Sequence, residues 1–392
     1  MKTANTSRII KKANQHLLFH TIKEYEPITI EEIIRKTRLS RPTVLTLLDE
    51  LLSRKIVQKA GFGESMGGRQ PVLYSLDAGT YFAIGIDLEF PPMRIVFTDI
   101  KGNIVYSYEW EHDYSDKIQD IIEMILSQIE KGIKELNIPR ESIIGVGMGI
   151  AGTVDINNNV PINMVRIRGW NRTPINTIIQ ERTGFKVYVR NDAHLVGMVE
   201  KSLPKGMENF LYIGYRTGIG VGVFNNGKLY DGEFGNPGYL GHTTVDFEGE
   251  KCYCGNRGCL ELYCSKPAIE KRYKELTGKK EKYAAIIAKS EQGDTAAAEV
   301  LERAGRYLGT GIANMIKLVD ISNVVIGDII CSEDNIFFKT IAATIKENVS
   351  GYTVKDVFVR CDVTDEYVFA LGGCLFVLDN FFTEPKLQLS VK

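Results

Sequence analysis

The first fifty residues carry apolar positions at helical spacing, interrupted by short polar breaks. A first helix is predicted from an apolar face that repeats every three or four positions: Ile9, Ile10, Ala13, Leu17 and Leu18. In "TIEEIIRKT", Thr29 and Glu32 have the spacing of a capping box. This spacing predicts that a second, short helix begins there.

A third helix is predicted after the turn "RLS", with Ser40 as its cap. Its apolar residues fall on one face: Val44, Leu47, Leu48 and Leu51. Arg41, Thr43 and Thr46 lie off that face, near the helix N-terminus. Guanidinium and hydroxyl groups in this position suit base edges and phosphates in a DNA major groove, so this helix is predicted to be a recognition helix.

The stretch "IVQKAGFGESMGGRQPVLYSLD" reads as strand, glycine-rich loop, strand, with Arg69 and Gln70 near the tip. Three helices followed by such a hairpin predict a winged helix-turn-helix over residues 1–80, with DNA as its partner. The alternative is a three-helix interaction module that does not contact DNA.

After Asp77 the pattern changes to glycine-punctuated apolar strands separated by long helical stretches, which predicts an α/β body. Two segments, "YFAIGIDLEFPPMRIVFTDIKGNIV" and "FLYIGYRTGIGVGVFNNGKLY", both read strand, turn, strand, turn. This weak internal repeat predicts two similar lobes. The first turn is "EFPP" in one copy and "RTGIG" in the other, where Thr217, Gly218 and Gly220 leave room for a phosphate.

Composition and charge narrow the function classes. The 392 residues are 44% hydrophobic and 25% charged, typical of a globular protein of two or three domains. Residues 1–80 carry 13 Lys/Arg against 8 Asp/Glu, and the rest carries 35 against 41. A basic head favours a polyanion as partner. Because no apolar run or leader pattern is evident, we expect a cytoplasmic protein with no membrane partner.

A metal site is predicted in "GHTTVDFEGEKCYCGNRGCLE". One imidazole and three thiolates make a closed tetrahedral zinc set, which is typical of a structural site: His242, Cys252, Cys254 and Cys259. Two glycines between Cys254 and Cys259 let the loop fold back on the metal. The alternatives are buried thiols or a redox pair. Cys264 is expected to be packed.

The stretch from "TGIGVGV" to "GCLELYCS", together with "RNDA" and "GGRQP", resembles the signature of the ROK family of repressors and sugar kinases. The head is similar to that of the repressor branch, which responds to sugars such as xylose and N-acetylglucosamine. The resemblance implies an actin-like, hexokinase-like domain with a structural zinc loop. We expect the first lobe over residues 81–205, with 370–392 returning to it, and the second lobe with the zinc loop over 206–369.

The resemblance also implies a sugar site. Asn191 and Asp192 in "VRNDAHLVG" match the sugar-binding pair, with Asp192 at the place of the kinase's catalytic base. An Asn-Asp turn at a strand end is the structural alternative. Asn163, His242 and Glu261 match further sugar contacts. Where the family has a Glu in "AGEIGH", this chain has Tyr239 in "PGYLGH", so a phenol replaces a carboxylate.

In kinases of this family, the turn that holds the ATP phosphates is "DLGGT", and here it is "DLEFPP". Glu89 adds negative charge and the prolines remove amide donors. Asp328 in "VVIGDII" is a second departure. The sequence therefore favours a repressor with a sugar effector and no catalytic residues.

Two other functions stay open at this point. They are a sugar kinase with a DNA-binding head and a regulator controlled by a protein partner. In each case we expect a homodimer, with tetramers open, because helix-turn-helix proteins usually read two half-sites with two-fold symmetry.

Overall fold

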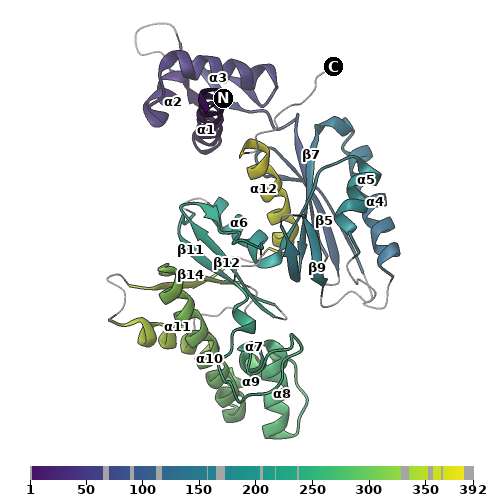
Figure 1. Cartoon of the computed structure of the whole chain (residues 1–392), viewed down its shortest axis with the longest axis vertical. Helices are drawn as coiled ribbons and strands as arrows, with labels where there is room; N and C mark the ends of the chain where they lie inside the picture. The colour runs from purple at the N-terminus through teal and green to yellow at the C-terminus, as the bar shows by residue number, and fades with distance from the viewer. Residues whose placement is uncertain are drawn as a thin grey trace. The chain divides into compact units, whose positions relative to one another are not determined.

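The structure is a computed structural model, and it describes residues 2–64, 70–88, 92–111, 117–156, 158–164, 173–203, 206–216, 218–235, 238–327, 335–351, 356–362 and 365–383. The chain forms two compact units (Figure 1). Unit 1 comprises Met1–Ile150, Met164–Val189 and Phe369–Lys392, and unit 2 comprises Ala151–Asn163 and Arg190–Val368. Each unit is therefore assembled from segments that are distant in sequence.

The N-terminal head of unit 1 contains three helices and a small antiparallel sheet in the strand order β1-β3-β2. Its elements are α1 (Lys2–Tyr25), β1 (Ile28–Thr29), α2 (Ile30–Thr37), α3 (Arg41–Ser53), β2 (Val57–Phe62) and β3 (Val72–Leu76).

Both predicted helix caps are confirmed. Thr29 Oγ1 accepts a hydrogen bond from the Glu32 N–H at 3.2 Å, and the Glu32 carboxylate accepts one from the Thr29 N–H at 3.0 Å. The hydrogen bond from the Thr29 backbone lowers the pKa of Glu32. Ser40 Oγ accepts from the Thr43 N–H at the start of α3. The predicted apolar face of α3 is buried in the head: Val44, Leu47, Leu48 and Leu51.

The large sheet of unit 1 has the strand order β10-β7-β4-β5-β6. Its strands are β4 (Phe82–Asp87), β5 (Met93–Asp99), β6 (Ile104–Trp110), β7 (Ile143–Ile150) and β10 (Val187–Asn191). Three helices and a short 3-10 turn accompany it: α4 (Ile118–Glu135), η1 (Arg140–Ser142), α5 (Ile175–Thr183) and α12 (Val368–Thr383). Figure 1 shows α4 and α5 on one face of the sheet and α12 on the other.

The sheet of unit 2 has the strand order β13-β12-β11-β14-β15. Its strands are β11 (Phe210–Tyr215), β12 (Ile219–Asn225), β13 (Lys228–Leu229), β14 (Asn323–Gly327) and β15 (Phe358–Cys361). A two-stranded sheet pairs β8 (Gly152–Asp155) with β9 (Val160–Met164). The helical elements are α6 (Asp192–Ser202), η2 (Leu240–His242), α7 (Glu261–Cys264), α8 (Lys266–Thr277), α9 (Tyr283–Glu291), α10 (Thr295–Val319) and α11 (Ile336–Val349).

The predicted internal repeat is confirmed by strand pairing. β4 and β5 form an antiparallel hairpin in unit 1, as β11 and β12 do in unit 2. The first strand of each hairpin also pairs in parallel with a later strand, β7 in one unit and β14 in the other. The predicted hairpin turn after β12 has positive φ angles at Asn226 (52°) and Gly227 (67°), as this turn type requires.

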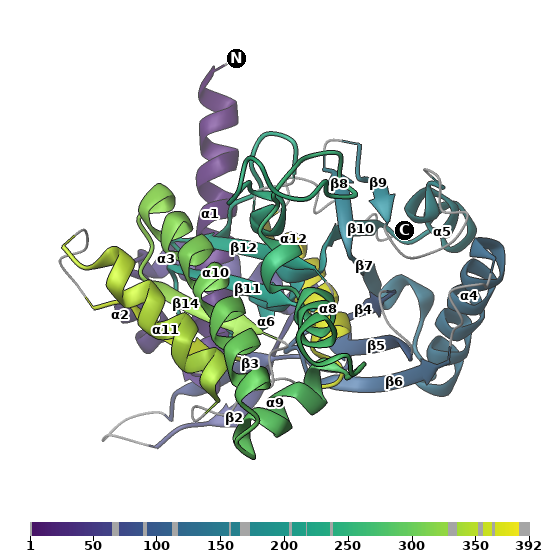
Figure 2. The ribbon, with the colours of Figure 1, turned by 90° about the horizontal axis from the view of Figure 1, so that it is seen from below.

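Alternating residues of β11 face opposite sides of the second sheet. Leu211, Ile213 and Tyr215 belong to a large buried core with residues of α10 and α11. On this side α10 packs along α11 (Figure 2). On the other side α6 packs on β11 and β12. One junction between the two units falls between residues 189 and 190, just before α6.

Among the helices that the structure describes, none combines the length and apolar character needed to cross a bilayer.

Glycines let α12 approach the first sheet closely. A Cβ added at Gly85 in β4 would lie 1.8 Å from the Ala370 carbonyl oxygen. One added at Gly147 in β7 would lie 2.2 Å from the Gly373 carbonyl oxygen. Both contacts are to backbone, which cannot move aside without shifting the helix. The absence of side chains at these two strand positions therefore sets the distance between helix and sheet.

We expect Gly147→Ala to lower the free energy of unfolding by about 1 to 3 kcal/mol, the usual cost of overpacking a core. Denaturant unfolding of the purified protein measures this difference. The matched control is Gly79→Ala, where the added Cβ would make only an ordinary 3.6 Å contact with Asp77. Equal stability of the two variants would contradict the close approach of α12.

Candidate functional site

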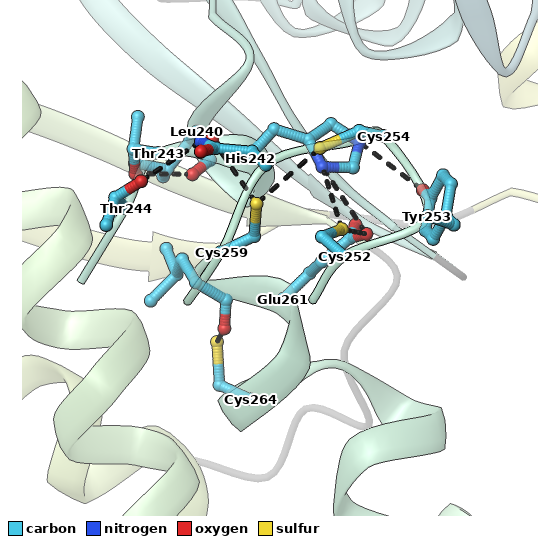
Figure 3. Close-up of polar contacts among 12 residues, drawn as sticks. Leu240, His242, Thr243, Thr244, Cys252, Tyr253, Cys254, Cys259, Glu261 and Cys264 are labelled. Carbon is cyan, nitrogen blue, oxygen red and sulfur yellow. Dashed lines mark hydrogen bonds and ion pairs between the residues drawn. The ribbon is translucent and has the colours of Figure 1, made fainter. Parts of the chain in front are cut away.

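The predicted metal ligands come together in the loop between η2 and α7. One ligand atom from each of the four residues lies within 4.8 Å of all the others: His242, Cys252, Cys254 and Cys259. The Cys252 Sγ lies 3.7 Å from the His242 Nδ1, and the Cys254 Sγ lies 3.6 Å from the Cys259 Sγ. Figure 3 shows the four side chains converging.

The loop folds back on itself through short backbone pairings. Thr244 bridges to Cys259, and Lys251 bridges to Arg257. Gly258 permits the return because its φ is 59° and a Cβ there would lie 1.5 Å from the Asp246 carbonyl oxygen. The predicted role of glycine in bringing the cysteines together is thus confirmed at this position.

The protonation of the thiols depends on their surroundings. Burial raises the pKa of Cys252, and it raises the pKa of Cys259 to about 12. At Cys254 burial acts in the same direction, but hydrogen bonds from the Asn256 backbone and the neighbouring thiols outweigh it and lower the pKa. Without a cation, thiolates are thus unfavourable at two of the three cysteines. A donor set of this kind fits a thiophilic divalent cation, which favours the deprotonated form.

Cys264 stays outside the cluster. It is fully buried and its thiol donates to the Leu260 carbonyl oxygen at 3.3 Å. This agrees with the expectation that it is packed.

The second ring nitrogen of His242 has a polar partner of its own. Its Nε2 lies 3.3 Å from the Tyr253 hydroxyl, whose pKa is raised chiefly by burial and further by the Glu261 carboxylate. The two rings meet edge to face, with centroids 5.3 Å apart. His242 can therefore use Nδ1 for the cluster and Nε2 for a polar partner.

Glu261 begins α7 and is only 5% exposed. Its Oε1 lies 3.5 Å from the His242 Nδ1 and 3.7 Å from the Cys252 Sγ. Its Oε2 lies near the start of β12, 3.5 Å from where a Cβ at Gly218 would be. One carboxylate thus contacts the cluster through one oxygen and faces β12 with the other.

Tyr239 links the cluster to the N-terminus of α6. Its ring is 37% exposed and stacks on the His242 ring, with centroids 5.9 Å apart. Burial raises the pKa of Tyr239, against a hydrogen bond with Thr153, and the Asp192 carboxylate raises it further. The Tyr239 phenol therefore lies in the electrostatic field of Asp192 and stays protonated at neutral pH.

Asn191 is the N-cap of α6. Its Oδ1 accepts from the Ala193 N–H at 3.0 Å, and its Nδ2 donates to the Gly152 carbonyl oxygen at 3.3 Å. Asp192 Oδ1 accepts from the same N–H at 2.9 Å. These contacts fix both side chains at the helix start without excluding further hydrogen bonds from a ligand.

Several predicted positions fall outside the described residues. They are Arg69 of the hairpin, Thr217, the turn residues Glu89, Phe90 and Pro91, and Asp328. The backbone of Asn163 belongs to β9, but its side chain is outside the described part.

The predicted contact residues of the head lie at the exposed start of α3. Arg41 and Thr46 are exposed, and Ser40 Oγ is 2.7 Å from Thr43 Oγ1. Gln70 is exposed before β3. The Arg41 guanidinium donates to the Glu31 carboxylate at 3.0 Å, an ion pair exposed on both sides. Such a pair is weak and leaves the guanidinium available to exchange partners.

Two residues that lie near the site, Thr153 and Tyr253, were not identified from the sequence. Tyr253 carries a usable signal, since it stands between two ligands and must lie beside them. Thr153 carries none, because its proximity to Tyr239 arises only from the tertiary fold.

Solved structures share the fold. A ROK family transcriptional regulator, described as a homologue of Escherichia coli MLC protein, superposes with a TM-score of 0.80 at 21% identity, over 95% of this chain and 97% of that one. A ROK hexokinase from Thermus thermophilus gives a TM-score of 0.65 at 25% identity, over 75% of this chain and 97% of that one. The body thus has the hexokinase-like α/β fold predicted for it.

Proteins of known function are also similar in sequence to this chain. The xylose repressor of Bacillus subtilis is 29% identical over 374 residues, 95% of this chain and 96% of the repressor. The N-acetylglucosamine repressor of Escherichia coli O6:H1 is 25% identical over 353 residues, 86% of this chain and 85% of that protein. The ROK family profile matches residues 83–374, which confirms the predicted resemblance. The chain belongs to the ROK family.

Proposed function

We propose that the protein is a sugar-responsive, DNA-binding transcriptional repressor of carbohydrate-utilisation genes. The observation that carries this proposal is similarity to named repressors along nearly the whole chain, including the head that precedes the family domain. The hexokinase similarity covers 75% of the chain, a share that fits the body alone.

The head is a winged helix-turn-helix in this proposal. Its order of three helices and an antiparallel hairpin supports that assignment. α3 is the recognition helix and uses Ser40, Arg41, Thr43 and Thr46, while Arg69 and Gln70 of the hairpin contact the DNA backbone. A homodimer, or a tetramer of paired dimers, reads an operator with two half-sites in the cytoplasm.

Zinc is the metal of the Cys/His cluster in this proposal. When bound, it cross-links a loop that is built from turns and isolated bridges rather than from regular strands. The position of His242 and the contact of Glu261 with the cluster make the metal a support for the ligand site rather than a reagent.

The effector is a sugar that hydrogen-bonds to Asn163, Asn191, Asp192, His242 and Glu261. Tyr239 adds an aromatic face, which suits the C–H face of a pyranose, and one hydroxyl. Asp192 accepts a hydrogen bond from a sugar hydroxyl and does not act as the general base that would activate this hydroxyl for phosphoryl transfer. The supporting observation is the sequence "EFPP", which puts Glu89 and two prolines where family kinases hold phosphates.

The main test is thermal unfolding against xylose, N-acetylglucosamine and glucose, and separately against Mg-ATP. A sugar at 100 times its dissociation constant should stabilise the protein by about 2.7 kcal/mol, and Mg-ATP should not. Asp192→Asn should lose the sugar shift. A shift with Mg-ATP would favour a kinase, and operator binding with no sugar shift would favour control by a protein partner.

Arg41→Ala should weaken operator binding by about 1 to 3 kcal/mol, because it removes a positively charged donor from α3. Fluorescence anisotropy with labelled operator DNA measures the loss. Sugar binding and zinc content should not change. Arg272→Ala, which removes an exposed guanidinium on α8, is the matched control and should bind operator normally. If both variants bind alike, α3 is not the recognition helix.

Cys254→Ser should lose about one zinc ion per chain and destabilise unit 2, because the free energy of metal binding is part of the free energy of folding. Elemental analysis and thermal unfolding give the two readouts. Cys264→Ala removes a thiol that lies outside the cluster and should keep its zinc. Zinc retention in Cys254→Ser would mean that the ligand set is wrong.

A further inference from the structure

A second group of metal-binding side chains lies in unit 1, away from the Cys/His cluster. His16 and His20 on α1 and Asp379 on α12 bring one ligand atom each within 4.8 Å of one another. Among the described residues, these three and the Cys/His cluster are the groups with that geometry. Nothing in the proposed function uses them.

The two histidines are placed by helix geometry. Residues four apart in an α-helix lie on the same face, one turn above the other. The His16 and His20 rings accordingly have centroids 4.1 Å apart, and Phe19 contacts the His20 ring edge to face at 5.3 Å. Two imidazoles at this spacing on one helix are a common metal-binding pair.

The third side chain comes from the opposite end of the sequence. The close contacts of Gly85 and Gly147 hold α12 on the sheet. The last turns of α12 then reach the head region, where the Phe381 ring lies 5.5 Å from the Tyr81 ring. Tyr81 in turn donates to the Arg54 carbonyl oxygen, just after α3. The position of Asp379 is therefore fixed by packing on both sides.

The chemistry of the three donors is that of a transition-metal site. With two neutral imidazoles and one carboxylate as ligands, a divalent ion keeps a net charge of +1. Three protein ligands also leave further coordination positions of the ion free for water. Two donors about 2.1 Å from one ion lie about 3 to 4 Å apart, so small side-chain rotations suffice. The three side chains are half-buried, and the His20 Nε2 atom is buried from solvent.

We infer that His16, His20 and Asp379 bind a divalent transition-metal ion, which cross-links α1 of the head to the C-terminal helix α12. This second metal site contains no sulfur and is open to water, whereas the Cys/His cluster is closed. The competing arrangement is direct hydrogen bonding between the histidines and the Asp379 carboxylate with no ion. The inference does not depend on the proposed repressor function.

Co²⁺ added to the full-length, zinc-loaded protein tests the site. The thiolates of the Cys/His cluster favour Zn²⁺, and protein sites generally bind Zn²⁺ more tightly than Co²⁺. Zinc therefore stays in that cluster, and the added Co²⁺ reports on the second site. We expect saturable binding of about one Co²⁺ per chain, with weak visible bands and no sulfur-to-cobalt charge transfer. The melting temperature should rise by about 3 °C on saturation.

His20→Ala and Asp379→Asn should each weaken Co²⁺ binding at least tenfold and abolish the thermal shift. Asp379→Asn keeps the size of the side chain, so it remains informative if His20→Ala fails to fold. Gln15→Ala is the matched control, because Gln15 lies beside the pair on α1 but contacts Glu50 on α3 instead. It should bind Co²⁺ like the unmodified protein.

Two results would overturn the inference. One is the absence of saturable Co²⁺ binding in the zinc-loaded protein, which would leave direct hydrogen bonding as the arrangement. The other is unchanged Co²⁺ affinity in Asp379→Asn, which would place the bound ion elsewhere.

Discussion

The contact between the backbone of α12 and two strands of the first sheet is the constraint on which unit 1 depends. Gly85, Gly147 and Gly373 remove the side chains that would otherwise separate helix from sheet. Because that distance is short, the far end of α12 also packs against Tyr81, at the junction of head and sheet. One helix thereby contacts both the sheet and the junction between sheet and head.

Local patterns carried the reliable part of the fold prediction. The capping box at Thr29, the cap at Ser40 and the Asn226-Gly227 turn each depend on neighbouring residues, so their physics is complete within a few positions. The packing of α6 on β11 and β12 could not be predicted in this way. It depends on small residues in distant strands, such as Gly214, where a Cβ would lie 3.0 Å from the Ala193 Cβ.

The same distinction applies to the candidate site. The Cys/His cluster could be predicted because its four ligands lie within eighteen residues of one another and their chemistry is specific. The contact of Tyr239 with Thr153 could not, since it joins segments that are more than eighty residues apart. The His16, His20 and Asp379 group is the extreme case. Its two histidines are visible as a helical pair, but the carboxylate comes from the other end of the chain.

The chain segments that make up each unit also set the order in which the two units can be completed on the ribosome. All the residues of unit 2 have been synthesised once the chain reaches Val368. Unit 1 began first, yet at that moment it still lacks α12 and leaves the glycine face of β4 and β7 uncovered. Domains generally fold as units during synthesis. The internal unit can therefore form before the unit that encloses it in sequence, and the head acquires its final support only after α12 has been synthesised.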